Sequence, residues 1–246
     1  MENQTVPERW PALISDRAIF IVGLAFFTLP LVITFFLKAA GFISQPTGPG
    51  VSASGISTAA LTALVNLALL EVFVRVKRRE MISDQALGTV MPNSNRWFLS
   101  AILAYFVLVF LMALVTVFLQ IVPSEELKDA SRELLKQSKG FISFAVTFLS
   151  IVIIAPICEE LMFRGFFYGW LRQRMSMDVA VVVSSLLFGL VHFQYLNLDR
   201  ESVFIAMFFV CGLGFFAARL REKSGSIYPP IVLHGFSNLV VFWNLY

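Results

Sequence analysis

The chain has 246 residues, of which 58% are hydrophobic and only 14% are charged. Its mean hydropathy is +0.79, and the charged share is about half that of an average soluble protein, which excludes a water-soluble globule. The net charge of +3 is spread along the chain, whereas nucleic-acid binding needs clustered Lys and Arg, so DNA and RNA are excluded as partners. Cys158 and Cys211 lie in apolar runs, which excludes a secreted disulfide framework.

Seven apolar segments are predicted to cross the membrane, because roughly 20 helical residues span its hydrocarbon core. The first, 18–37, is interpreted as a retained membrane helix, since no small-residue cleavage site follows it. The stretch 41–55, rich in Gly, Pro and Ser, predicts a loop. The remaining predicted spans are 56–76, 97–122 with Pro123 as its stop, 141–157 with an extension to Arg174, 179–193, 203–220 and 227–246.

The segment 124–138 between the third and fourth spans predicts an amphipathic helix at the membrane interface. It places Leu127, Ala130, Leu134 and Leu135 on one helical face. The predicted fold is therefore an all-α, polytopic integral membrane bundle of about seven transmembrane helices plus one interfacial helix. Lys and Arg are twice as frequent in the loops on the side of the N-terminus, which predicts a cytoplasmic N-terminus and membrane lipids as surroundings.

Ionisable side chains inside predicted spans need a reason, because each costs about 2.5 to 3.5 kcal/mol on insertion scales. Glu71 lies four residues before Arg75 near a span end, so a helical ion pair explains it without a function. The other ionisable side chains within the spans are Glu159, Glu160, Arg164, His192 and His234.

Glu159 and Glu160 are adjacent in one predicted helix and point about 100° apart, so they cannot share one role. Arg164 lies four residues after Glu160 and is predicted to pair with it. Glu159 then lacks a local counter-ion and is a candidate general base. The alternative is that these residues form a salt-bridge cluster between helices.

The only two histidines, His192 and His234, each lie one helical turn from a distinctive side chain. Phe188 precedes His192 by four residues, and Asn238 follows His234 by four. A single histidine in a span is as consistent with packing as with a site. Two imidazoles, a carboxylate and an amide on three helices are together the groups needed to hold and activate a water molecule, by metal coordination or by hydrogen bonds alone.

Three motifs resemble those of the CPBP intramembrane proteases, the CAAX protease and bacteriocin-processing enzyme (Abi) family, which includes the eukaryotic type II CAAX prenyl endopeptidase. Residues 159–164 match EExxxR, 188–192 match FxxxH, and 234–238 match HxxxN, in the family's order. The resemblance covers 141–246, which we expect to be the catalytic transmembrane core. The region 1–140, with its tail, three spans and interfacial helix, carries no motif of the family.

The resemblance implies a membrane-bound hydrolase: an endopeptidase that cleaves membrane-associated or lipidated peptides and proteins, in CAAX-type C-terminal processing or bacteriocin processing. It implies a catalytic Glu159 supported by Glu160 and Arg164, and an oxyanion donor in Asn238. It also implies that the site includes His192, His234 and, in contact with substrate, Phe188.

The family has been described both as metalloproteases and as metal-independent glutamate proteases. Glu159, His192 and His234 could supply the three ligands of a catalytic zinc. We favour no tightly bound metal, because the usual helix-borne pair HExxH is absent and Asn is an uncommon zinc ligand.

Two other functions stay open from the sequence. A proton- or ion-coupled transporter would use intramembrane Glu, His and Arg as a relay, although here they form one cluster rather than a path. A non-catalytic immunity or scaffold protein of the same fold would be favoured by a substituted motif position, and none is seen. Other intramembrane protease classes are disfavoured by the absence of HExxH and GxGD, and Cys158 adjoins a glutamate that opposes thiolate formation.

Overall fold

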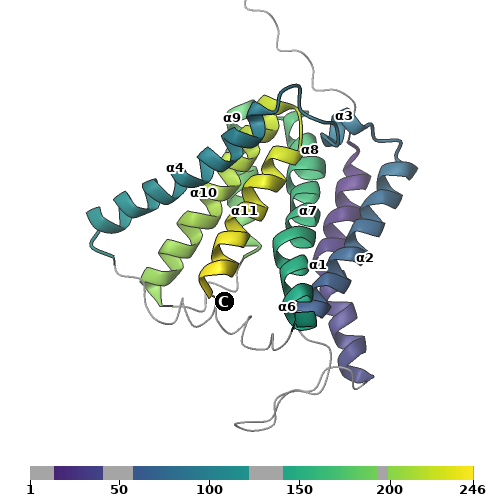
Figure 1. Cartoon of the computed structure of the whole chain (residues 1–246). Helices are drawn as coiled ribbons and strands as arrows, with labels where there is room; N and C mark the ends of the chain where they lie inside the picture. The colour runs from purple at the N-terminus through teal and green to yellow at the C-terminus, as the bar shows by residue number, and fades with distance from the viewer. Residues whose placement is uncertain (1–13, 41–57, 122–140, 193–198, 246) are drawn as a thin grey trace, which may run out of the picture.

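The computed structural model describes residues 14–40, 58–121, 141–192 and 199–245. All regular elements in these ranges are helices (Figure 1), which confirms the predicted all-α fold. Four of them are long and apolar enough to cross a membrane, so the chain is an integral membrane protein. They are α1 (Asp16–Ala39), α4 (Arg96–Phe118), the continuous helix Phe141–Arg172 and α10 (Arg200–Ser224).

The remaining described helices are α2 (Thr58–Arg79), α3 (Asp84–Leu87), the shorter apolar α9 (Met177–Leu190) and α11 (Tyr228–Leu245). Figure 1 shows the long helices side by side in one bundle, with α3 at the upper end and α4 inclined away from the others at its lower end. Because only four of the described helices combine the required length and hydropathy, the total of seven spans stays a prediction. The cytoplasmic N-terminus stays a prediction as well.

The predicted boundaries differ from the structure in several places. The third span was predicted to reach residue 122, but α4 ends at Phe118. The backbone of Gln120 has a φ of 54°, and this left-handed turn ends the helix before Pro123 is reached. The fifth span was predicted to reach residue 193, but the corresponding helix α9 ends at Leu190. Helices α2 and α10 are longer than the predicted spans, because their charged ends continue the helix. The predicted loop at 41–55 and the interfacial helix at 124–138 lie outside the described residues.

The helix Phe141–Arg172 contains two π-helical segments. It runs through α6 (Phe141–Phe148), η1 (Leu149–Ile154), α7 (Ala155–Glu160), η2 (Leu161–Phe167) and α8 (Tyr168–Arg172). The N–H of Ala155 donates to the carbonyl of Ser150, and the N–H of Tyr168 donates to that of Phe163. Both bonds reach five residues back, where an α-helix would use the carbonyls of Ile151 and Arg164. Such π segments are frequent at functional sites.

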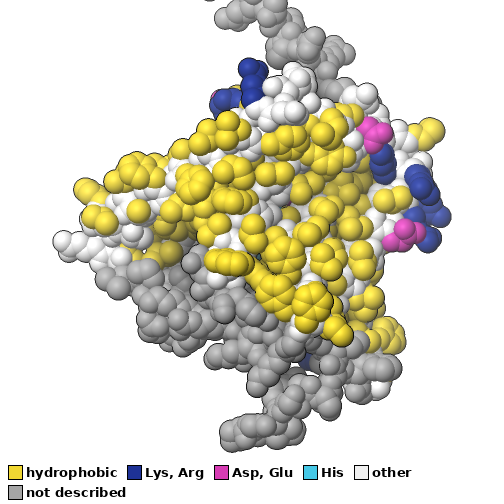
Figure 2. Space-filling view, viewed as in Figure 1, with side chains coloured by type: hydrophobic (Ala, Val, Ile, Leu, Met, Phe, Trp, Pro, Cys, Tyr) yellow, Lys and Arg dark blue, Asp and Glu magenta, His cyan; other side chains and the backbone are white. Residues whose placement is uncertain are grey.

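The surface between the helix ends is apolar. Figure 2 shows hydrophobic side chains over the middle of the visible face, with charged side chains near its upper end and right edge. Large side chains such as Phe20, Leu31, Phe110 and Val117 are more than half exposed. This distribution suits a bundle surrounded by lipid, because the hydrocarbon core offers no partner to a charged group.

Small residues allow α9 and α10 to pack closely. A methyl group built on Gly189 would lie 2.3 Å from Cys211 Sγ, and one on Gly214 would lie 3.1 Å from Ser185 Cα. Glycine and serine at helix contacts let backbones approach, which is the usual basis of helix packing in membranes. The close contact fixes the end of α9, where Phe188 and His192 are located.

We expect Gly189→Ala to destabilise the fold by about 1 to 3 kcal/mol, the usual cost of overpacking. The added methyl group would overlap Cys211 Sγ, so Cys211→Ala in the same chain should restore most of the loss. Thermal unfolding of the detergent-solubilised variants measures both effects. A double variant no more stable than Gly189→Ala would contradict this account of the helix contact.

Candidate active site

Glu160 and Arg164 form a buried ion pair inside the bundle. Arg164 Nη1 donates to Glu160 Oε1 at 2.9 Å, and Nη2 donates to the backbone carbonyl of Gly214 at 3.0 Å. Both charged side chains are at most 1% exposed. The arginine also lies over the ring of Phe188, with Cζ 4.3 Å from the ring centroid. The predicted pairing of Arg164 with Glu160 is therefore confirmed.

His234 of α11 joins this pair, which the sequence analysis did not foresee. Its Nδ1 lies 2.9 Å from Glu160 Oε1, a contact between residues 74 positions apart. Because Arg164 holds that carboxylate as an acceptor, the Nδ1 atom carries the hydrogen. The Nε2 atom of His234 then has a lone pair, which lies on the side of Glu159.

His192 adopts the same tautomer by a different contact. Its Nδ1 lies 2.8 Å from the carbonyl oxygen of Phe188, one turn earlier. A carbonyl can only accept, so Nδ1 donates and Nε2 has the lone pair. The Nε2 atoms of His192 and His234 each lie 3.9 Å from Glu159 Oε2. The structure thus brings together the three side chains that the sequence singled out.

Glu159 differs from Glu160 in lacking a direct partner. Its Oε2 atom is buried and has no hydrogen-bond partner among the described residues, although the side chain is 21% exposed. A separation of 3.9 Å from each imidazole is too long for a hydrogen bond. A water oxygen within hydrogen-bond distance of Glu159 Oε2 and of either Nε2 atom would bridge such a separation.

The same three side chains match a zinc site in kind and in number, but not in spacing. Bonds of 2.0 to 2.1 Å to a tetrahedral zinc place ligand atoms about 3.3 Å apart, whereas both imidazoles lie 3.9 Å from Glu159 Oε2. In the part of the chain that the structure describes, no group of three or more His, Cys, Asp or Glu is arranged to hold a metal ion. No step of the reaction below is assigned to a metal.

Asn238 lies on α11 one turn after His234 and is held by η1. Its Nδ2 donates to the backbone carbonyl of Ile151 at 2.9 Å. This is the carbonyl that Ala155 does not use, because the π segment directs the N–H of Ala155 to Ser150. The contact orients the amide, which has a second N–H. Its predicted role as an oxyanion donor stays a prediction.

Phe188 lies behind the site rather than at its surface. The ring is fully buried, with its centroid 4.9 Å from that of His192 and 5.5 Å from that of His234. The ring has no exposed surface in this structure and packs against both imidazoles, while the substrate contact expected for Phe188 stays a prediction. It supports both imidazoles and the Arg164 guanidinium from one side.

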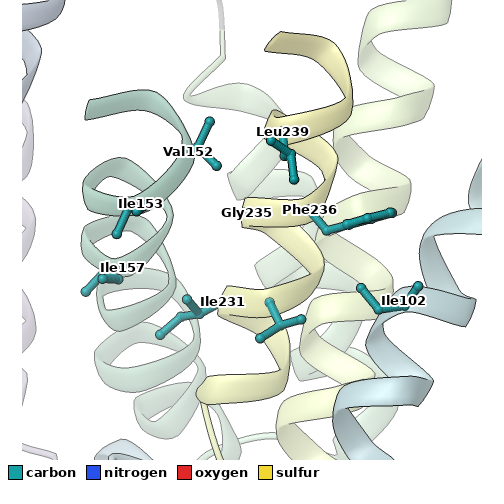
Figure 3. A pocket seen from close by; sticks show the side chains of 9 residues that line it. Ile102, Val152, Ile153, Ile157, Ile231, Gly235, Phe236 and Leu239 are labelled. Atoms are coloured by element: carbon teal, nitrogen blue, oxygen red, sulfur yellow. The ribbon is translucent and has the colours of Figure 1, made fainter. Parts of the chain in front are cut away.

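An apolar groove lies between η1, α7, α11 and α4 (Figure 3). Its volume is about 330 Å³, and Ile157 on its wall lies two residues before Glu159. Figure 3 shows the other walls formed by α11 and by Ile102 of α4. A methyl group on Gly235 would lie 3.0 Å from the carbonyl oxygen of Val152, so this glycine allows α11 to approach η1.

Outside the cluster, Glu71 has the simple explanation that the sequence suggested. Its Oε1 lies 2.7 Å from Arg75 Nε, and both side chains are more than half exposed. An exposed helical pair of this kind contributes only a few tenths of a kcal/mol.

Comparison with known proteins finds one matching family and several bacterial relatives. The family described as type II CAAX prenyl endopeptidase Rce1-like matches residues 141–240. An Escherichia coli protein named "Uncharacterized 24.3 kDa protein" is 32% identical over 168 residues, which are 68% of this chain and 70% of that protein. No solved structure matches.

Two shorter matches come from other bacteria. "Putative membrane peptidase YdiL" of Bacillus subtilis (strain 168) is 33% identical over 99 residues, 39% of this chain and 37% of that protein. "UPF0177 protein YbdI" of Lactococcus lactis subsp. lactis (strain IL1403) is 33% identical over 109 residues, 42% of this chain and 50% of that protein. The chain thus spans half or less of these two relatives.

The Escherichia coli match is longer than the region 141–246, so it includes residues of the N-terminal region. The division at residue 140 stays a prediction.

We expect Arg164→Ala to destabilise the protein more than Glu160→Gln does. Removing the cation breaks a buried ion pair, which typically costs about 3 to 5 kcal/mol. A glutamine at position 160 is neutral, and its amide oxygen still accepts from Arg164. Melting temperatures of the two purified variants in the same detergent test this order, and equal values would contradict it.

Proposed function

Because the chain belongs to the Rce1-like family of type II CAAX prenyl endopeptidases, we propose that it is an intramembrane endopeptidase in which Glu159 activates a water molecule. The observation that carries the proposal is the convergence of Glu159 Oε2 on the Nε2 atoms of His192 and His234, 3.9 Å from each. These side chains come from α7, from the turn after α9 and from α11. They lie within the helical bundle and are at least 79% buried.

The water molecule lies between Glu159 and the two imidazoles in this proposal. As its oxygen attacks the carbonyl carbon of the scissile peptide bond, one of its protons passes to Glu159. The carbonyl oxygen becomes an oxyanion, and the second N–H of Asn238 is our candidate donor to it. The C–N bond then breaks, the carbonyl re-forms, and Glu159 returns the proton to the leaving amine.

Glu160 and Arg164 have supporting roles in this mechanism. The ionised carboxylate of Glu160 holds the Nδ1–H of His234, so the Nε2 lone pair is directed to the water. Arg164 donates to Glu160 and is itself fixed by a second bond to the carbonyl of Gly214 on α10. Glu160 accepts two hydrogen bonds at Oε1, which supports giving the role of base to Glu159 in this proposal.

A membrane-associated peptide or protein, with or without a lipid, is the proposed substrate. The groove between η1, α7, α11 and α4 is lined by apolar side chains and suits an apolar segment of the substrate. The name of the Bacillus subtilis relative includes the words membrane peptidase, which agrees with this class of substrate.

Glu159→Gln is expected to lower peptide cleavage by at least about 10²- to 10⁴-fold, because the amide cannot take a proton from water. The fold should be retained, since glutamine is nearly isosteric with glutamate. Cleavage is measured with fluorogenic lipidated and unlipidated peptides in proteoliposomes. Glu71→Gln is the matched control and should keep wild-type activity, because Glu71 forms only an exposed pair. Near-wild-type turnover in Glu159→Gln would assign the base to Glu160 instead.

Chelation separates a metal-dependent from a metal-independent site. A zinc ion bound to the folded state would stabilise it, so a chelator would lower both activity and melting temperature. We expect a chelator to change neither, while His192→Ala and His234→Ala each abolish cleavage by losing the orientation of the water. Stoichiometric zinc in the purified protein, lost together with activity in either histidine variant, would overturn this expectation.

A further inference from the structure

Arg221 is a buried cation that none of the three motifs contains. It lies in the last turn of α10 and is 1% exposed. Its Nε donates to the backbone carbonyl of Arg164 at 3.2 Å, and its Nη2 donates to those of Ala86 at 3.1 Å and Gln85 at 3.4 Å. One guanidinium thus joins α10, η2 and α3. A rigid planar group with five donors is suited to this use, and a lysine is not.

The π segment explains why the Arg164 carbonyl accepts from Arg221. In an α-helix this carbonyl would accept the N–H of Tyr168, but in η2 that N–H donates to Phe163. Asn238 has the equivalent contact with Ile151 in η1. Each π segment therefore releases one carbonyl from its regular partner, and each of these carbonyls receives a side chain from α10 or α11.

Gly88 provides the space for the Arg221 guanidinium. A methyl group there would lie 2.5 Å from Arg221 Cζ and 2.6 Å from its Nε, and the φ of Gly88 is 71°, which also favours glycine. The carbonyl of Gly88 accepts the N–H of Ile227 at 2.9 Å, immediately before α11 begins. The loop after α3 therefore contacts both Arg221 and the start of the helix that carries His234.

Helix α10 holds Arg164 at two points. Arg221 binds the backbone carbonyl of Arg164. Two turns earlier on α10, the carbonyl of Gly214 accepts from the Arg164 side chain. The same side chain donates to Glu160, whose Oε1 also binds His234. A continuous series of hydrogen bonds thus leads from Arg221 through Arg164 and Glu160 to His234.

We propose that Arg221 is a positioning residue for peptide cleavage, which acts through Arg164 and Glu160 on the orientation of His234. It does not contact Glu159 or the water position. The inference rests on the proposed function, and it predicts a loss of turnover without a matching loss of substrate binding.

The first test is Arg221→Lys in the full-length protein in detergent micelles. Lysine keeps the charge but cannot bind three carbonyls from one planar group. We expect kcat to fall on the order of 100-fold, as for a displacement of about 1 Å at the site, with KM near the wild-type value. Arg219→Lys is the matched control, because Arg219 lies two residues earlier on α10 and its Nη1 contacts Asp178 and Met177 Sδ, outside this series of hydrogen bonds. An unchanged kcat in Arg221→Lys would overturn the proposal.

A double-mutant cycle separates positioning from a general structural role. If Arg221 acts through Glu160, then Arg221→Lys should cost far less turnover in a Glu160→Gln background than in the wild type. Losses that multiply independently would show that Arg221 acts elsewhere and would overturn the proposal.

A third measurement does not depend on activity. The chain has only two histidines, so mass spectrometry can follow their modification by diethyl pyrocarbonate separately. We expect Arg221→Lys to accelerate modification of the buried His234 relative to Arg219→Lys, and an unchanged rate would overturn the inference. If the wild type cleaves no peptide, the proposed function fails, while this labelling still decides the role of Arg221. If Arg221→Lys does not fold, the variant Gly88→Ala is tested instead, because its methyl group displaces the same guanidinium.

Discussion

Two donors meet on one buried oxygen, Glu160 Oε1, and the arrangement of the site depends on this contact. Arg164 Nη1 and His234 Nδ1 each lie 2.9 Å from it. A carboxylate without partners in a dry interior would cost several kcal/mol, so the packing of α11 against the helix Phe141–Arg172 is tied to this bond. The same bond fixes the tautomer of His234. Helix packing and the chemistry of the site thus depend on a single carboxylate.

Aromatic packing supports the polar cluster from behind. Phe188 contacts the Arg164 guanidinium and both imidazoles, and Phe163 meets Phe188 edge to face with their centroids 5.2 Å apart. Such rings exclude water and bind the cation with their π face. The polar groups can therefore stay close together at membrane depth, where electrostatic interactions are strong. Phe188 thus supports the site by packing.

The two π segments allow the helix Phe141–Arg172 to serve as a scaffold to which α10 and α11 are attached. A regular helix satisfies its own backbone groups and offers side chains alone to its neighbours. Here the carbonyls of Ile151 and Arg164 are contacted by Asn238 and Arg221, so α10 and α11 are attached to the backbone itself. The two attachment points lie on either side of Glu159 and Glu160. They restrict both glutamates relative to the histidines, and preorganisation of this kind is a large part of catalysis in a water-poor site.

The sequence by itself determined the features that depend on local spacing and composition. Apolar runs of helical length predicted the membrane helices, and spacing of four residues predicted the pairs Glu160–Arg164 and Glu71–Arg75. The three motifs also contain Glu159, His192 and His234, which the structure brings together. Only the tertiary structure decided the contacts between distant segments, namely Glu160 with His234, Asn238 with Ile151 and Arg221 with Arg164. The physical reason is that these contacts join residues 57 to 87 positions apart and depend on how the helices pack, which leaves no periodic signal in the amino-acid sequence.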